Sequence, residues 1–153
     1  MLAVVVPLVL LANGLAAGVL VGTQLGGWPL LLALPPDRYV HAHAFFTHRY
    51  DPFMPICLVI TIGGDVVLAV GAPGVVPRLL FCLGALLVLV TITVSITRNV
   101  PVNRWLRTLD PNDLPADFAA RDPRRYWGSW NRLRSVCALV ALLANCLALA
   151  VLV

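Results

Sequence analysis

The sequence predicts an all-α integral membrane protein that folds as a four-helix bundle. Of its 153 residues, 60% are hydrophobic and 12% are charged, whereas charged residues make up about 25% of an ordinary soluble domain. Four apolar runs, at residues 2–22, 53–72, 79–97 and 133–153, are each long enough to cross a hydrocarbon core about 30 Å thick as a helix. We therefore expect residues 1–153 to form a single transmembrane domain, with short interfacial helices in the first and third loops.

The first expected span carries a stripe of small residues. No Lys or Arg precedes its apolar core, so we expect it to stay as a helix rather than to be removed as a signal peptide. Gly14, Gly18 and Gly22 recur every four residues, a spacing that allows another helix to approach closely. That helix belongs either to the same chain or to a second copy in a homo-oligomer.

The first loop contains a predicted helix that carries all three histidines. An apolar stretch, Trp28 to Leu34, is expected at the membrane interface and ends at a pair of prolines. Asp37 is then placed to cap a helix that runs to Tyr50. The Asp51-Pro52 pair is typical of a fresh helix start, so we expect the second span to begin there.

On that helix, His41, Phe45 and His48 share one face, and His43 points elsewhere. His41 and His48 are two turns apart, about 10.5 Å along the axis, which is too far for these two alone to chelate a metal. Three roles are open for the histidines: hydrogen bonding to loop carbonyls, general-base catalysis, or ligation of a metal or haem with help from another segment.

Asp65 is the one acidic residue within the expected apolar spans. An ionisable group at that depth is a candidate functional residue. Asn145 on the fourth span lies at a similar depth, so a structural hydrogen bond between the two side chains is the interpretation that we favour.

The longest polar segment, residues 98–134, connects the third and fourth spans. Pro101 disfavours helical backbone at the preceding residue, so we expect the third helix to end near Arg98. Asp113 is placed to cap a short amphipathic helix with Leu114 and Phe118 on one face. The Asp122-Pro123 pair then starts a helix that runs into the fourth span.

The distribution of arginine predicts the orientation. Ten of the eleven arginines lie in or beside the first and third loops, and Arg78 alone lies on the other side. The positive-inside rule places those two loops in the cytoplasm and both termini outside, in a cytoplasmic membrane of bacterial type. Because these arginines adjoin membrane helices, the net charge of +4 does not indicate nucleic-acid binding.

Aromatic residues gather at the same end. Every Trp and Tyr lies on the first or third loop or at an adjoining helix end. At the start of the fourth helix, Trp127, Trp130, Asn131 and Arg134 follow three- and four-residue spacings and form one surface. These residues either anchor the protein at the interface or line a pocket for a flat apolar substrate.

Three segments carry a resemblance to a known family, namely the NVPVN motif after the third span, WGSWNRLR before the fourth, and a histidine-bearing segment before the second. In these segments the chain resembles the anthrone oxygenase family of small four-helix membrane proteins. It implies a membrane-bound oxygenase or oxidoreductase of a natural-product pathway. Such an enzyme would use O₂ to oxidise a small, apolar, aromatic or polyketide-like metabolite, as in the conversion of an anthrone to an anthraquinone.

The resemblance also implies roles for individual residues. An anthrone reacts with O₂ through its enolate, which requires a base and hydrogen-bond donors for the oxyanion. His41 or His48 would be the base, and Arg134, Asn99 and Asn103 the donors. The substrate would contact a further set of side chains, namely Trp105, Trp127, Trp130, Asn131 and Phe45.

Two alternatives remain open at this point. In one, the oxidoreductase holds iron, copper or haem through His41, His43 and His48. In the other, the protein is a non-enzymatic membrane scaffold or an accessory subunit whose polar loops bind a partner.

Overall fold

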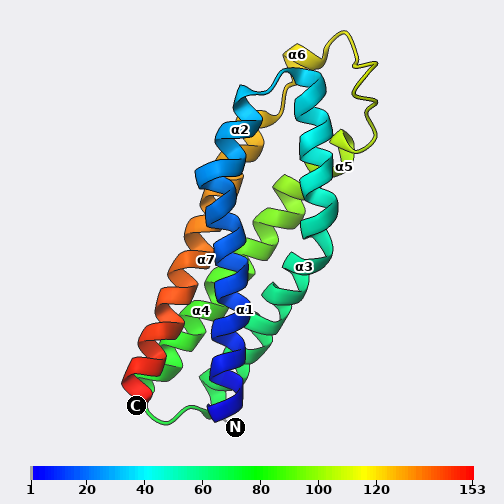
Figure 1. Ribbon diagram of the computed structural model, residues 1–153. Helices are drawn as coiled ribbons and strands as arrows, with labels where there is room; N and C mark the ends of the chain where they lie inside the picture. Colours follow the sequence, from blue (N-terminus) through cyan, green and yellow to red (C-terminus); the bar gives the residue numbers. More distant parts are fainter. Residues whose placement is uncertain (1) are drawn as a thin grey trace.

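The computed structural model describes residues 2–153, which form four long helical rods (Figure 1). The first rod comprises α1 (Leu2–Gly22), the π-helical turn η1 (Thr23–Gly27) and α2 (Trp28–Ala33), and the second is α3 (Pro36–Gly71). The third comprises α4 (Val75–Val94), the π-helical turn η2 (Ser95–Asn99) and α5 (Val100–Leu106), and the fourth comprises α6 (Phe118–Arg121) and α7 (Arg124–Leu152). Each rod is long and apolar enough to cross a membrane. The predicted fold class is therefore confirmed.

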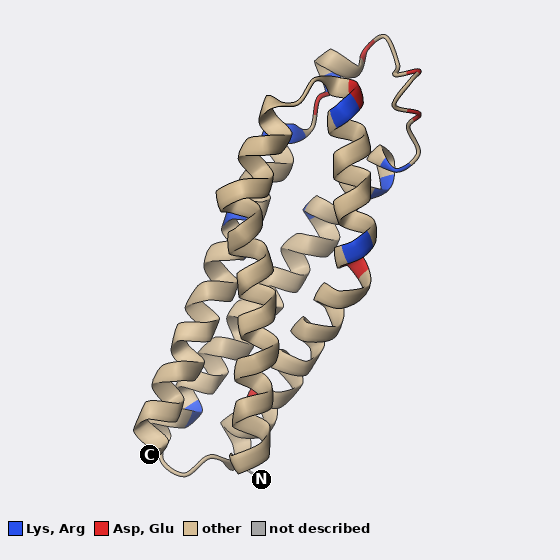
Figure 2. Ribbon diagram, in the orientation of Figure 1, with Lys and Arg blue, Asp and Glu red and all other residues tan. Residues whose placement is uncertain are grey.

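The two ends of the bundle differ in charge. Both termini lie at one end, and the first and third loops lie together at the other (Figure 1). Figure 2 shows most of the charged residues at the loop end. The predicted grouping of the two loops is thus present, and their cytoplasmic location stays a prediction from the arginine count.

Two helices pass through prolines at which we expected one helix to end and another segment to be separate. Pro29 and Pro101 each lie one residue after a π-helical turn, at the second position of α2 and α5. Proline has no amide N–H and its ring collides with the carbonyl four residues earlier. The wider π turn moves that carbonyl aside. The third helix consequently runs to Leu106 rather than ending near Arg98, and Trp28–Ala33 prolongs the first helix instead of forming a separate segment.

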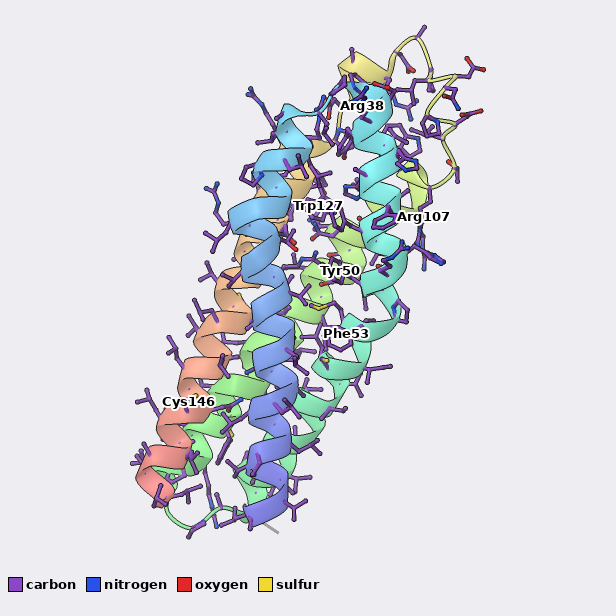
Figure 3. All side chains as sticks on the ribbon, in the orientation of Figure 1. Arg38, Tyr50, Phe53, Arg107, Trp127 and Cys146 are labelled. Atoms are coloured by element: carbon purple, nitrogen blue, oxygen red, sulfur yellow. The ribbon has the colours of Figure 1, made fainter. Side chains whose placement is uncertain are left out.

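The second rod also lacks an expected boundary. α3 passes without interruption through Asp51, although Pro52 and Pro55 lie inside it. The two prolines remove backbone hydrogen bonds, and a helix with such a defect bends rather than breaks when its surroundings favour helix. Figure 3 shows a change in the direction of α3 near Tyr50 and Phe53.

The third loop contains less helix than expected. Its helix, α6, begins at Phe118 and is four residues long, so Asp113 does not cap it. Pro115 explains the late start, because the residue before a proline avoids helical geometry. The predicted start after Asp122-Pro123 is confirmed, since α7 begins at Arg124.

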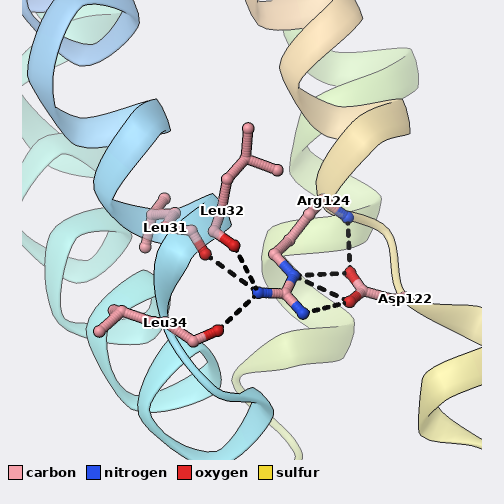
Figure 4. Close-up of polar contacts among 5 residues, drawn as sticks. All are labelled: Leu31, Leu32, Leu34, Asp122 and Arg124. Atoms are coloured by element: carbon pink, nitrogen blue, oxygen red, sulfur yellow. Dashed lines mark hydrogen bonds and ion pairs between the residues drawn. The ribbon is translucent and has the colours of Figure 1, made fainter.

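Arg124 fastens the first loop to the start of α7. Its Nη1 donates to the carbonyl oxygens of Leu31, Leu32 and Leu34 at 3.2, 3.4 and 2.7 Å, and its Nε donates to Asp122 at 2.8 Å (Figure 4). These carbonyls belong to the end of α2, where no helical N–H is available to them. One side chain therefore caps the first rod and holds its end against the start of α7 in the fourth rod.

A hydrophobic cluster, here called the cap cluster, joins the two loops beyond the membrane-spanning part. Its buried members come from all four rods: Leu31, Tyr39, Val40, Leu106 and Phe118. Trp105 stacks on Phe118 with ring centroids 5.9 Å apart. Because the cap cluster is packed like a small core, the loop end of the bundle is a defined structure that can support a site.

The hydrogen bond that we favoured for Asp65 is present. Asn145 Nδ2 donates to Asp65 Oδ2 at 3.4 Å, and both residues are fully buried. When the side-chain oxygen of Asn13 is turned toward Asn145, this oxygen accepts a hydrogen bond from Asn145 Nδ2 at 3.3 Å. The side-chain nitrogen of Asn13 then donates to the carbonyl oxygen of Ala138 at 3.3 Å. The amide nitrogens of Asn13 and Asn145 and one oxygen of Asp65 are thus paired in an apolar environment, where an unpaired amide is costly. Asp65 Oδ1 and Asn145 Oδ1 have no hydrogen-bond partner among residues 2–153.

Gly84 on α4 makes room for this contact. A Cβ atom at this position would lie 2.7 Å from Asn145 Oδ1 and 2.8 Å from Asp65 Oδ2. We expect Gly84→Ala to lower the free energy of unfolding by about 1–3 kcal/mol, because an inserted methyl group in a packed core forces its neighbours apart. Thermal unfolding in detergent micelles measures this change.

Gly63 on α3 provides the matched control. A Cβ atom there meets nothing within 4 Å, so Gly63→Ala should gain up to about 1 kcal/mol of helix propensity. Equal melting temperatures for the two alanine variants would contradict the steric role of Gly84.

Candidate functional site

A cavity of about 620 Å³ lies between the first rod and α3, toward the loop end. Its inner wall is formed by the third and fourth rods, through Ser95, Asn103, Trp127 and Arg134. In Figure 3, Trp127 and the lining residue Tyr50 lie between the first rod and α3. The volume falls within the range of about 300–1,000 Å³ that is typical of small-molecule sites.

The glycine stripe forms one wall of this cavity. Gly14, Gly18 and Gly22 all line it, and a Cβ atom at any of them would meet nothing within 4 Å. The stripe therefore does not serve a close approach between helices of the same chain, which corrects one of our two expectations. Association of two copies through the stripe stays a prediction.

His43 is held by one oxygen atom that accepts two hydrogen bonds. Asn103 Oδ1 lies 3.0 Å from His43 Nε2 and 2.8 Å from Trp127 Nε1. Because an indole nitrogen can only donate, the atom facing Trp127 is the amide oxygen of Asn103 rather than its nitrogen. His43 Nε2 must then carry a proton to donate to the same oxygen. This contact fixes the imidazole in its Nε2–H form.

The fixed tautomer leaves His43 Nδ1 with an unshared electron pair. His43 is 1% exposed, and Nδ1 has no hydrogen-bond partner among the described residues. His43 is also one of the residues that line the cavity. A buried, neutral imidazole with an unpaired nitrogen has the chemistry of a general base.

Trp127 owes its position to neighbours on both sides. Gly128 lets Trp28 lie directly against the backbone of α7, at a place where a Cβ atom would overlap the Trp28 ring. The Trp28 and Trp127 rings are 6.2 Å apart, and Asn99 Nδ2 donates to the Trp127 carbonyl at 3.1 Å. The indole N–H is consequently aimed at Asn103 by packing as well as by hydrogen bonding.

Arg134 brings a positive charge to the wall of the cavity. Its Nε donates to Asn131 Oδ1 at 2.8 Å and its Nη1 donates to Ser95 Oγ at 3.1 Å. The guanidinium lies 5.8 Å from the centre of the Trp127 ring. Within residues 2–153 no carboxylate forms an ion pair with it. The group is therefore available to a negatively charged oxygen.

The structure brings together only some of the residues that the sequence nominated. Asn103, Trp127 and Arg134 line the cavity, while Asn99 and Asn131 support Trp127 and Arg134. The others lie away from the cavity: Trp105 belongs to the cap, and Trp130 packs against Tyr126 and beneath Arg98.

The histidine face corrects our expectation about the base. His41 and His48 are exposed, and Phe45 is 47% exposed with Arg49 stacked over its ring. They do share a face, as predicted, but this face points away from the cavity. The histidine that lines the cavity is His43.

A signal for this arrangement was present in the sequence. Arg38 and Arg49 are eleven residues apart, close to three helical turns, so they mark one face of the helix as the polar exterior. His41 and His48 lie near that face, whereas His43 lies about 140° around the helix from Arg38.

The three histidines are not arranged to form the predicted metal or haem site. Among residues 2–153, no group of three or more His, Cys, Asp or Glu side chains is placed to hold a metal ion. His41 and His48 face outward while His43 is already bonded to Asn103. The three histidines therefore do not form a common ligand set.

Comparison with known families places this geometry in context. The model of the anthrone oxygenase family matches residues 43–144. The chain belongs to the anthrone oxygenase family. The matched segment contains His43, Asn103, Trp127 and Arg134, four of the polar residues of the cavity wall. No curated protein and no solved structure matches the chain.

Trp127→Phe tests the contact that fixes the tautomer, because phenylalanine keeps an aromatic ring and removes the N–H donor. In the wild-type protein, ¹⁵N NMR of labelled histidine should show His43 protonated at Nε2 and unprotonated at Nδ1. The variant should show a mixture of the two tautomers, with a loss of about 0.5–1.5 kcal/mol in the free energy of unfolding.

Trp130→Phe is the control, because Trp130 lies away from the cavity. Its histidine spectrum should match that of the wild type. A wild-type spectrum with the proton on Nδ1 would contradict the assignment.

Proposed function

We propose that the protein is a membrane-embedded, O₂-dependent oxidoreductase that oxidises a flat, apolar carbonyl compound of the anthrone type at an activated methylene carbon. One observation carries the proposal: His43, with its unpaired Nδ1, and Arg134, with no carboxylate partner, line the same cavity. A base and a cation around an apolar space are what the formation of an enolate requires. Membership of the anthrone oxygenase family supports the class of reaction.

The first step is removal of a proton from carbon. His43 Nδ1 takes one hydrogen of the methylene group as H⁺, and the electron pair of that C–H bond passes into the ring system and onto the carbonyl oxygen. Arg134 stabilises the resulting oxyanion. Because the surroundings are apolar, this charge interaction is stronger than it would be in water. Nδ1 is closed to solvent, so the ring or its neighbours must move slightly to meet the substrate.

The second step consumes O₂ without a redox group of the protein. The enolate carbon bonds to one oxygen atom and the O₂ unit is reduced to a peroxide, which takes the proton from the His43 imidazolium. Loss of the second methylene hydrogen as H⁺ then forms the new C=O bond as the O–O bond breaks. The leaving hydroxide and that proton make water. In sum, one CH₂ group and one O₂ give one ketone and one H₂O.

The apolar part of the cavity wall can bind a substrate that makes few polar contacts. Phe46, Tyr50 and Trp127 present rings to the cavity, and α1 presents glycines. A flat apolar molecule gains binding free energy from such surfaces through burial and stacking. Exclusion of water also protects the enolate from being protonated again before O₂ reacts.

His43→Ala should reduce the enzyme-dependent rate by about 10²–10⁴-fold, the usual contribution of a positioned base. The measurement is O₂ uptake together with the absorbance of anthraquinone, with anthrone supplied to the protein in lipid nanodiscs. The rate in protein-free nanodiscs is subtracted, because anthrones oxidise slowly by themselves.

His41→Ala and His48→Ala are the matched controls, since both residues lie on the same helix and face outward. They should retain the wild-type rate. Full activity of folded His43→Ala would exclude this base, and a wild-type rate equal to that of protein-free nanodiscs would favour a non-enzymatic role.

A further inference from the structure

The cavity opens sideways, between the first rod and α3. Gly18 and Gly22 line it and are themselves exposed, so the wall of α1 continues to the outer surface of the bundle. On the opposite side, Met54 and Leu58 of α3 line the cavity. The opening is therefore flanked by two membrane-spanning helices.

The surface around this opening is apolar. Leu11 and Leu15 on α1 are 61% and 45% exposed, and Ile56 and Val59 on α3 are 59% and 62% exposed. Large apolar side chains exposed at this level of a membrane-spanning helix face lipid. A molecule dissolved in the hydrocarbon can consequently reach the cavity without passing through water.

Arg134 marks the inner, polar end of the cavity. Its Nε and Nη1 are used by Asn131 and Ser95, and its Nη2 makes no hydrogen bond within residues 2–153. Asp51 also lines the cavity, but its carboxylate is paired with Arg107 at 2.8 Å. A largely buried guanidinium without a counter-charge is costly, and an anionic oxygen on a bound molecule would offset that cost.

The walls favour a planar molecule over a flexible chain. On α1 the stripe glycines leave backbone exposed between the side chains of Leu15 and Val19. On α3 the rings of Phe46 and Tyr50 are stacked 6.3 Å apart with only 5° between their planes. A slot with exposed helix backbone on one side and ring systems on the other matches a flat aromatic body.

We propose that the cavity takes planar aromatic anions laterally from the bilayer, with the glycine stripe as one wall of the slot and Arg134 as the contact for the anionic oxygen. The proposal rests on the cavity of the proposed oxidation, whose enolate is itself a planar aromatic anion, but its test depends on binding alone. It assigns the glycines to ligand access rather than to helix association.

The test measures binding with probes that cannot be oxidised by the proposed reaction, because they lack an activated methylene group beside a ring carbonyl. Anthracene-9-carboxylate is the planar anion, 9-methylanthracene its neutral counterpart, and cis-parinarate an anion with a flexible chain. Energy transfer from tryptophan to each probe is titrated with protein in phosphatidylcholine nanodiscs, and protein-free nanodiscs correct for partition into lipid.

We expect the wild-type protein to bind anthracene-9-carboxylate at least tenfold more tightly than either of the other two probes. Arg134→Gln should remove the preference for the anion over 9-methylanthracene. Equal affinities for these two probes in the wild type, or tighter binding of cis-parinarate, would overturn the proposal.

Gly18→Leu tests the wall independently, because Gly18 makes none of the hydrogen bonds of Arg134. It should weaken binding of both anthracene probes at least tenfold by filling the slot. Gly63→Leu is the matched control, since Gly63 is equally open but lies outside the cavity, and it should bind like the wild type. Wild-type binding by Gly18→Leu would overturn the proposal even if Arg134→Gln fails to fold.

The two proposals fail separately. Loss of turnover in His43→Ala with unchanged probe binding concerns the chemistry alone. Probe binding that ignores charge and Gly18 removes the inferred ligand class and leaves the base mechanism to its own assay.

Discussion

The amide oxygen of Asn103 is the point at which three rods of the bundle meet. It receives one hydrogen bond from His43 on α3 and one from Trp127 on α7, and Asn103 itself lies on α5. Each partner is buried, so none can exchange this contact for water without a penalty. The interaction therefore sets the proton on His43, the direction of the indole and the depth of α5 relative to α7. The polar wall of the cavity follows from these three positions.

This contact at Asn103 requires helices that extend beyond the length needed to cross the hydrocarbon core. The third rod reaches Asn103 only because the π turn Ser95–Asn99 carries the helix past Pro101. π-Helical turns within α-helices are frequently found at functional sites. Here the turn supplies Ser95 to Arg134 and Asn99 to the Trp127 backbone. The π turn, an irregularity in the helical hydrogen bonding, thus positions Arg134 and Trp127 in the cavity wall.

Tight packing and open space are distributed unevenly across the bundle. Toward the end with the termini, Val9, Leu68 and Phe81 pack into a buried cluster, and Asp65 and Asn145 close against Gly84. Toward the loop end, the glycines of the first rod face the cavity instead of another helix. Arg124 and the cap cluster hold the loops beyond the cavity in place. The bundle can thus keep a large cavity between two helices without losing the positions of its walls.

The sequence predicted features that depend on local properties of the chain better than features that depend on contacts between distant segments. The number of spans and the Asp65 to Asn145 contact followed from length, hydropathy and residue type, and helical spacing grouped Trp127 with Arg134. Asn103 was nominated through the resemblance to the anthrone oxygenase family. We expected His41 and His48 to face the site, but the structure places His43 there, although the arginines of the same helix already marked its outer face.

The sequence by itself determined that the chain crosses the membrane four times and gathers its polar and aromatic groups at one end, because hydrophobic length and charge act locally along the chain. Only the tertiary structure decided that helices pass through Pro52 and Pro101, that the glycines face a cavity, and that the amide oxygen of Asn103 joins His43 to Trp127. These features depend on contacts between rods far apart in the sequence, and no spacing within a single helix specifies them.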